Sequence, residues 1–422
     1  MELGKHKRGV QPKTRGDKPL KRDPSRLKVR SDLNLHPIQH EGENLILVED
    51  PLGLIQGQLV LTQFAAALLS LMDGNQTLGE LVEIVHQATQ KKVPPDVIRR
   101  HIDELAQCGL MEDEKYFDSR QAVFDDFKRR ESLTFRNAGT TYPGKADELR
   151  PWLDRILDSS TPSMPHPPRL IIAPHIDFRV NTETYGKAYS QLKGHGYDRV
   201  ILMGTGHSIR DGLYCPTWKD LSSPLGTSPT DKEAVQLLMS SGDGILSDND
   251  YAHHGEHALE FQIIFLQHLL GTGDFEVIPI LCGSLHSYLC GGQRKEFIED
   301  TQAFLEALRL LVNQPGKRTL VVGGIDFSHV GTRFSHSRPA SAMLEETRCH
   351  DRDLIDAFIA WDADRFWKVE SESEGSFHVC GFSTMATLLE ILNPGEVRCL
   401  DYSVWDDSPT GSAVTFAALA AC

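Results

Sequence analysis

Short apolar runs alternate with helical stretches from residue 169 to the C-terminus, and this alternation constrains the fold most strongly. Four of the apolar runs end in loop residues, at 169–173, 199–204, 275–281 and 319–324. Between them lie stretches with helical spacing of apolar residues, at 182–193, 231–239, 256–270 and 294–312. Strands that alternate with helices typically form a parallel sheet covered by helices. We therefore predict an α/β fold over 169–422, with a largely parallel central sheet flanked by helices and two more strands near its C-terminus.

The chain before residue 169 divides into three predicted segments. The first thirty residues carry eleven Lys or Arg, three acidic residues and few apolar ones, so 1–31 is expected to be a disordered basic tail. Residues 32–116 contain three stretches of helical spacing, one opened by a T-x-x-E capping pattern, and then a short β wing at 110–117. This pattern predicts a small helical winged-helix domain. Residues 117–168 are expected to form a helical connector and a proline-rich linker.

The charge and the cysteines exclude several classes of protein. The net charge is −15 although the first thirty residues are basic, so the rest of the chain is acidic, which argues against a main domain that binds nucleic acid. The basic head lacks the apolar core of a signal peptide, and no apolar run has the length of about 18 residues that a membrane span needs. We expect a cytoplasmic protein without a membrane segment. The eight cysteines include no C-x-x-C pair, so neither a disulfide framework nor a zinc ribbon is expected.

Reactive side chains follow the predicted strands at the point where each strand ends. His175 follows the first strand, His207 the second, and Asp326 and His329 a later one. A single histidine in such a loop more often serves as a hydrogen-bonding residue, but several together favour a site, since ligands bind beyond the carboxyl ends of parallel strands. Cys380 begins a predicted helix, where amide dipoles favour the thiolate. Two imidazoles with an anionic ligand are typical of non-haem iron, and a thiolate also admits copper or zinc.

The segment His253-x-x-Glu256-His257 has the H-x-x-E-H order of inverted zinc proteases. Both histidines must then lie on one face of a helix, and Gly255 interrupts the segment at a cost of about 1 kcal/mol within a helix. The predicted helix begins at Glu256, so a metalloprotease is the weaker interpretation. A plainer alternative is that Glu256 and Glu260 only supply negative charge to the first helical turns.

The C-terminal domain resembles the Memo family, protein B of the AmmeMemoRadiSam system, which is related in fold to class III extradiol (LigB-like) dioxygenases. The resemblance rests on pieces that occur in the family's order across roughly 250 residues: APH, GTGH, GEHALEFQIIFL, GGIDFSH and VCGF. One departure is APHIDF, where the family usually continues as APHAGY followed by a Gly-rich turn. The segment 32–116 resembles the PqqD-like family of winged helices, which often bind peptides.

The resemblance implies a role for several residues. The metal ligands would be His175, His207 and Cys380, whose ligand atoms we expect within about 4 Å of one another. The remaining residues of the implied site are Asp326 and His329 in catalysis, with His329 matching the acid/base histidine of the dioxygenases, and Glu256 and His257 at the substrate.

The function implied is that of a metal-dependent redox protein with a dioxygenase-like activity. Iron is the first choice of metal, copper the alternative, and zinc the least favoured. A radical SAM protein and an AMMECR1-like protein of the same system would be partners, and a peptide would be the ligand of the N-terminal domain. The alternative is a non-catalytic protein that binds a peptide or partner through a vestigial site.

Overall fold

The computed structural model describes residues 26–40, 42–89, 93–247, 249–289 and 293–422. The basic tail expected at 1–31 therefore lies mostly outside the described residues. The chain divides into two compact units, Met1–Arg129 and Arg130–Cys422, which are described separately. None of the helices in the described ranges combines the length and the apolarity that crossing a membrane requires.

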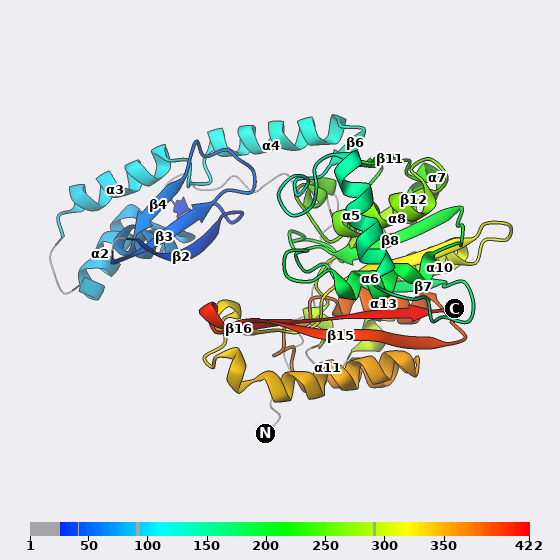
Figure 1. The fold of residues 1–422 in the computed structure, drawn as a ribbon. Helices are drawn as coiled ribbons and strands as arrows, with labels where there is room; N and C mark the ends of the chain where they lie inside the picture. The colour runs from blue at the N-terminus through cyan, green and yellow to red at the C-terminus, as the bar shows by residue number, and fades with distance from the viewer. Residues whose placement is uncertain (1–25, 41, 90–92, 248, 290–292) are drawn as a thin grey trace, which may run out of the picture. The chain divides into compact units, whose positions relative to one another are not determined.

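The described part of the first unit contains two small antiparallel sheets and four helices (Figure 1). The sheets consist of β2 (Asn34–His40), β3 (Glu43–Glu49) and β4 (Leu59–Thr62), and of β1 (Arg26–Lys28) and β5 (Asp73–Thr77). The helices are α1 (Gln63–Ser70), α2 (Leu78–Thr89), α3 (Pro95–Gln107) and α4 (Glu114–Arg129). One apolar core includes residues of β3, β4, α1, α2 and α3, and α3 contributes Ile98, Ile102 and Leu105 to it.

The three helices predicted for this unit are confirmed in α1, α2 and α3. The β wing expected at 110–117 is confirmed only at its start, where Met111 pairs with Val29 in an antiparallel bridge. It is wrong for the rest, because a helix begins there: the Asp113 carboxylate accepts the N–H of Tyr116 at 2.7 Å, and α4 starts at Glu114. The prediction also omits β2 and β3, although the apolar run 45–48 is typical of a strand.

The second unit is built on a central sheet with the strand order β14-β16-β7-β13-β8-β12-β9, and β15 pairs with β16. The four strands β7, β13, β8 and β12 are parallel, and the outer ones are antiparallel to their neighbours. The strands are β7 (Leu170–Ala173), β8 (Arg199–Thr205), β9 (Tyr214–Pro216), β12 (Glu276–Cys282), β13 (Thr319–Gly324), β14 (His329–Gly331), β15 (Val397–Asp407) and β16 (Ser412–Ala421). The predicted α/β fold is confirmed.

Helices cover both faces of this sheet (Figure 1). They are α5 (Ala146–Asp158), α6 (Glu183–Tyr189), α7 (Lys232–Ser241), α8 (Glu260–Leu270), α9 (His286–Leu289), α10 (Arg294–Val312), α11 (Leu344–Ile359), α12 (Ala363–Glu372) and α13 (Phe382–Ile391). Alternate residues of the central strands, such as Ile172, Ile201 and Val321, enter the core beneath α7, α10 and α13. Their buried neighbours along each strand point to the opposite face, where α6 and α8 pack, as the period of two in a strand requires.

The predicted connector 117–168 is divided between the two units. Residues 117–129 belong to α4 of the first unit. In the second unit, β6 (Ser132–Thr134) pairs in parallel with β10 (Asp220–Ser223), and α5 packs on α6 and α8. The segment after Arg129 therefore contributes structure to the α/β unit, including a buried apolar face of α5.

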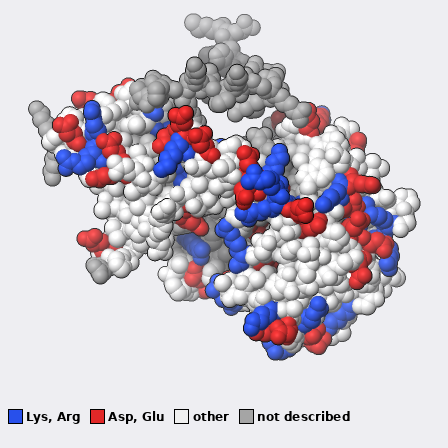
Figure 2. Space-filling model, turned by 90° about the horizontal axis from the view of Figure 1, so that it is seen from above, with Lys and Arg blue, Asp and Glu red and all other residues white. Residues whose placement is uncertain are grey.

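Acidic and basic side chains are interspersed over the face of the molecule seen in Figure 2. Exposed ion pairs of the described residues include Arg318 with Asp198 and Arg338 with Glu346. Pairs of this kind contribute little to stability. A mixture of both signs is typical of a solvated surface.

Candidate metal centre

Three potential metal ligands meet beyond the carboxyl ends of neighbouring strands. His175 follows β7 and His207 follows β8, the two strands that flank β13, and Cys380 stands just before α13. Their ligand atoms all lie within 4.8 Å of one another, and His175 Nε2 is 3.7 Å from Cys380 Sγ. The structure thus brings together the three residues that were predicted as ligands. Their ligand atoms lie slightly farther apart than the expected distance of about 4 Å.

The ring of His175 is fixed by the end of β13. Its Nδ1 lies 3.1 Å from the carbonyl oxygen of Gly324, so Nδ1–H donates there and Nε2 is left toward Cys380. The buried carboxylate of Asp326 accepts the backbone N–H groups of His175 and Ile176 at 3.0 and 3.3 Å. Asp326 therefore holds the loop that carries His175, and its other oxygen lies 3.6 Å from His175 Nε2.

The ring of His207 is fixed by Glu256. One carboxylate oxygen of Glu256 lies 2.9 Å from His207 Nδ1, and the carboxylate also accepts the backbone N–H groups of His207, His257 and Ala258. Glycine at position 324 lets the turn after Glu256 approach the end of β13, because a Cβ at this position would lie 2.3 Å from the carbonyl oxygen of Ala258. The carboxylate–histidine contact leaves Nε2 as the free ring nitrogen, as is typical of metal-bound histidines.

Cys380 is positioned by backbone hydrogen bonds to the strand-end loop after β13. Its N–H donates to the carbonyl of Phe327 at 3.3 Å, and the N–H of Gly381 donates to that of Asp326 at 3.0 Å. The hydroxyl of Thr205 donates to the Cys380 carbonyl at 3.1 Å, which ties this turn to the end of β8.

The charges of these groups favour a thiolate. Burial by itself would raise the pKa of Cys380, but the positive charges of His175 and His329 and hydrogen bonds from His175 and His207 hold it well below its usual range. Burial would likewise lower the pKa of His175, yet the charges of Asp326 and Cys380 raise it to about 9. Without a metal at pH 7, the thiolate therefore faces protonated His175 and His207, and a bound metal would take the place of a proton on each ring. Thiolate is the protonation state of sulfur that binds metals.

This donor set fits a single metal ion. Two imidazole nitrogens of fixed tautomer and one thiolate converge within 4.8 Å. Metal–ligand bonds of about 2.0 to 2.3 Å can bridge such a gap. His175 is buried, whereas the side chain of His207 is 42% exposed, so one side of the site is open to further ligands.

A second group with the spacing of metal ligands is His207, Glu256 and His257. Because both oxygens of Glu256 already accept N–H groups, this carboxylate fits an orienting role better than a direct ligand. The ring of His257 lies 5.2 Å from that of His175 and stacks on that of His207 at 5.3 Å between centroids. Burial and the charge of His175 lower the pKa of His257 to about 4, so it is neutral at pH 7.

His329 stands at the start of β14. Its N–H donates to the carbonyl of Phe377 at 2.8 Å, and its Nδ1 lies 3.1 Å from the carbonyl of Phe327. The half-buried ring is close enough for its charge to act on Cys380. His329 and His257 thus each present a ring near the ligands without belonging to the group of three.

The H-x-x-E-H segment does not form a helix. Residues Asp250–His253 form a 3-10 turn, Gly255 has φ of 79°, and α8 begins at Glu260. The prediction of a helix start at Glu256 is wrong, because its side chain accepts the first two following N–H groups in a turn. The buried His253 Nε2 lies 2.8 Å from the carbonyl of Cys215, and His253 belongs to no ligand group among the described residues.

Glu260, which follows Glu256 and His257 in the sequence, bonds to a different part of the unit. Its carboxylate accepts two N–H groups of Asn137, at 2.9 and 2.7 Å, and the hydroxyl of Tyr142 at 2.8 Å. Glu260 thereby anchors the segment between β6 and α5 on the α/β unit.

A cavity of about 390 Å³ opens next to His207 and Cys380. Its wall includes Glu370, His286 and His378, which the sequence reasoning did not identify. Only the nearness of His378 to Cys380 in FHVCGF was a sequence signal for them. The other two lie on helices whose placement depends on tertiary packing.

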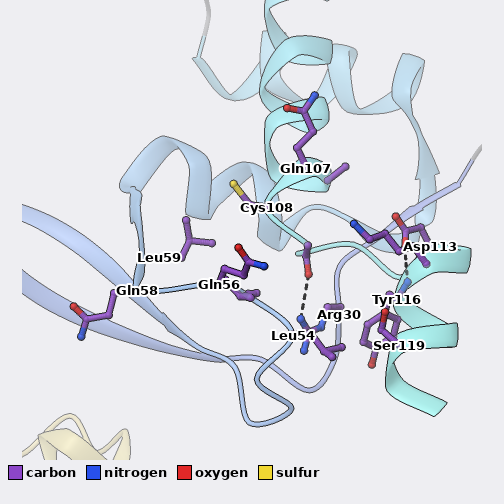
Figure 3. A pocket seen from close by; sticks show the side chains of 14 residues that line it. Arg30, Leu54, Gln56, Gln58, Leu59, Gln107, Cys108, Asp113, Tyr116 and Ser119 are labelled. Carbon is purple, nitrogen blue, oxygen red and sulfur yellow. Dashed lines mark hydrogen bonds between the residues drawn. The ribbon is translucent and has the colours of Figure 1, made fainter. Parts of the chain in front are cut away.

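The first unit has a cavity of its own, of about 690 Å³ (Figure 3). The Arg30 side chain at its wall is fully buried and donates to Asp32, Asp50 and the Gly109 carbonyl. The guanidinium is therefore satisfied within the protein. Glutamines and apolar side chains make up much of the remaining wall: Gln56, Gln58, Gln107, Leu54, Ile55 and Leu59.

Comparison with known proteins bears on both units. The family model described as Memo-like protein matches residues 134–420. A MEMO1 family protein of Aquifex aeolicus is 28% identical over 396 residues, which cover 93% of this chain and 99% of the relative. One of Thermus thermophilus is 26% identical over 351 residues, covering 81% and 98%. One of Aeropyrum pernix is 32% identical over 271 residues, covering 60% and 85%. The Aquifex match is longer than the α/β unit, so it extends into the first unit. The chain belongs to the Memo family.

Proposed function

We propose that this Memo family protein is a metal-dependent redox protein whose ion is held by His175 Nε2, His207 Nε2 and Cys380 Sγ. The observation that carries the proposal is the convergence of these atoms, with both Nδ1 atoms engaged by acceptors. A thiolate beside two imidazoles favours a redox metal, iron first and copper as the alternative, over a hard cation. Such an ion supplies one-electron chemistry and Lewis acidity, with dioxygen as the co-substrate.

The protein's own residues would orient the ion and move protons. Asp326 holds the His175 loop and Glu256 holds the His207 ring, so the ligand geometry is set before binding. His257 is neutral at pH 7, because its pKa is lowered to about 4, and its ring can accept a hydrogen bond from a substrate hydroxyl. His329, whose ring lies close enough to Cys380 for its charge to act there, is the second candidate for proton transfer.

The test is the metal content of protein purified without oxygen. We expect about one iron or copper per chain in the wild type, and loss of that metal in Cys380→Ser and His175→Ala, because each removes one of three ligands. His253→Ala is the matched control and should keep its metal. Retention of metal by Cys380→Ser together with loss in His253→Ala would contradict the proposal and support the zinc protease interpretation.

A second candidate function, binding of a peptide, concerns the first unit. The cavity in Figure 3 supports it, since its exposed glutamine side chains offer both donors and acceptors to a peptide backbone beside apolar side chains. In this proposal the protein works in the cytoplasm with a radical SAM protein and an AMMECR1-like protein.

A further inference from the structure

Glu370, near the C-terminal end of α12, is a buried carboxylate in the wall of the cavity beside the metal centre. It is 2% exposed, and it shares this cavity with His207 and Cys380. Its Oε2 lies 2.9 Å from Nε2 of His350, a buried residue of α11 whose ring stacks on Phe377 with centroids 4.3 Å apart. The contact with His350 therefore fixes the orientation of the Glu370 carboxylate.

The other oxygen of Glu370, Oε1, accepts no hydrogen bond from the described residues, and it is not enclosed by protein atoms, so it is accessible from the cavity. The two other buried glutamates of this unit behave differently. Both oxygens of Glu256 accept N–H groups, and both oxygens of Glu260 accept groups of Asn137 or Tyr142. Glu370 Oε1 therefore keeps its capacity to accept a hydrogen bond from a donor that enters the cavity. An acceptor of this kind in a cavity wall can bind the donor group of a ligand in place of water.

The rest of the wall defines the chemistry of that ligand. Glu370 is the one carboxylate among the described residues of the wall; Lys and Arg are absent from them, and Cys380 and three histidines, His207, His286 and His378, also line the cavity. Apolar side chains form a large part of the wall: Ile209, Leu285, Leu289, Val379 and Phe382. The cavity thus joins an acidic acceptor, an apolar surface and, through His207 and Cys380, the metal centre.

We propose that this cavity binds a small amine with an apolar body, whose ammonium group donates to Glu370 Oε1. This placement deepens the proposed function, since the far end of the amine would then lie toward the metal. Recognition of the ammonium itself depends on Glu370 and does not require the metal, so the two ideas can fail separately.

The experiment measures binding of three probes of similar shape to the metal-free wild-type protein at pH 7 by calorimetry. The probes are benzylamine, which is cationic, benzyl alcohol, which is neutral, and benzoate, which is anionic. A hydrogen bond between charged groups predicts that benzylamine binds about tenfold or more tightly than benzyl alcohol, and that benzoate binds most weakly. Absence of benzylamine binding, or equal binding of the three probes, contradicts the proposal.

Variants then locate the site. Glu370→Gln should remove the preference for benzylamine, whereas Glu372→Gln, the same change at an exposed position of the same helix, should keep it. If Glu370→Gln does not fold, Ser284→Trp narrows the cavity from an exposed wall position and should weaken benzylamine binding. Unchanged benzylamine affinity in the folded Glu370→Gln, or in Ser284→Trp, overturns the proposal. Metal content of the same preparations, measured after reloading, reports on the proposed function independently.

Discussion

At the scale of single residues, the ligand positions follow from a rule about strands, but their orientation does not. His175, His207 and Asp326 could be predicted because each follows an apolar run, and neighbouring parallel strands end at one edge of a sheet. That Glu256 holds the His207 ring could not be predicted, since it depends on a turn that the sequence suggested would be helical. Glu370 was missed for a similar reason, because only packing of α12 places it in the cavity.

The contact between Glu256 and His207 makes the first prediction at this scale. Glu256→Gln should reduce metal affinity by about 10- to 100-fold, the usual effect of removing a carboxylate behind a metal-bound histidine. The amide can accept at one position only and turns an N–H group toward His207 Nδ1–H or the backbone donors. Metal competition with a chelator measures the affinity. The control is Glu260→Gln, which is equally buried but bonds to Asn137 and Tyr142, and its metal affinity should stay unchanged.

At the scale of elements, the four parallel strands β7, β8, β12 and β13 lie where the sequence predicted them, because each is an apolar run buried on both faces. Ends of helices were harder to predict. The start of α8 moves from Glu256 to Glu260 and α4 begins inside the expected wing, since in each case a single carboxylate bonds to nearby backbone N–H groups. These contacts join residues that are close in sequence. Acidic residues near a predicted helix are common, however, so the sequence alone does not identify the carboxylate that sets where the helix begins.

The prediction at this scale concerns Asp231, whose carboxylate joins the start of α7 to β8. Its carboxylate accepts the N–H of Ala234 at 3.0 Å and that of buried Arg199 Nε at 2.8 Å. Asp231→Asn can keep the cap but leaves Arg199 without its counter-charge, which should destabilise the protein by about 3–5 kcal/mol in chemical unfolding. Asp198→Asn, which breaks the exposed pair with Arg318, should cost at most about 1 kcal/mol.

The pair of Asp231 and Arg199 also makes the stability of the protein depend on pH. Burial alone would raise the pKa of Asp231, but the N–H of Ala234 and the charge of Arg199 hold it below its usual 3.8. A carboxyl group whose pKa is depressed by folding stabilises the protein above the unfolded pKa, and that stability is lost as pH falls through the folded pKa. Unfolding measured from pH 6 downward should therefore lose less stability in Asp231→Asn than in the wild type. An equal loss in both proteins would show that this pair is not responsible.

At the scale of the whole molecule, the boundary between the units differs from the sequence prediction. The segment expected to be a connector contributes β6 and α5, and Leu149, Leu153 and Leu157 of α5 are buried. A proline-rich composition at 160–168 suggested a linker, yet Arg398 donates to the carbonyl of Ser163 at 2.7 Å. The Memo-like family model, which begins at residue 134, agrees with a division of the chain after Arg129.

This division predicts how fragments behave. Residues 130–422 produced alone should fold cooperatively and bind metal as the full chain does. Residues 169–422 lack α5 and the partners of Glu260, so this shorter fragment should unfold at a lower temperature or aggregate. Thermal unfolding and metal content of both fragments decide the matter. Equal stability of the two fragments would show that the segment 130–168 is a linker after all.

The central claim is that Cys380 and two histidines bind one metal, and X-ray absorption at the edge of the bound metal tests it most directly. Our account predicts one sulfur at about 2.3 Å and two imidazole nitrogens at about 2.0–2.1 Å, as in zinc sites with these ligands. Cys380→Ser should remove the sulfur shell from any metal that remains. A shell of nitrogen and oxygen alone in the wild-type protein would contradict the account and favour the group of His207, Glu256 and His257.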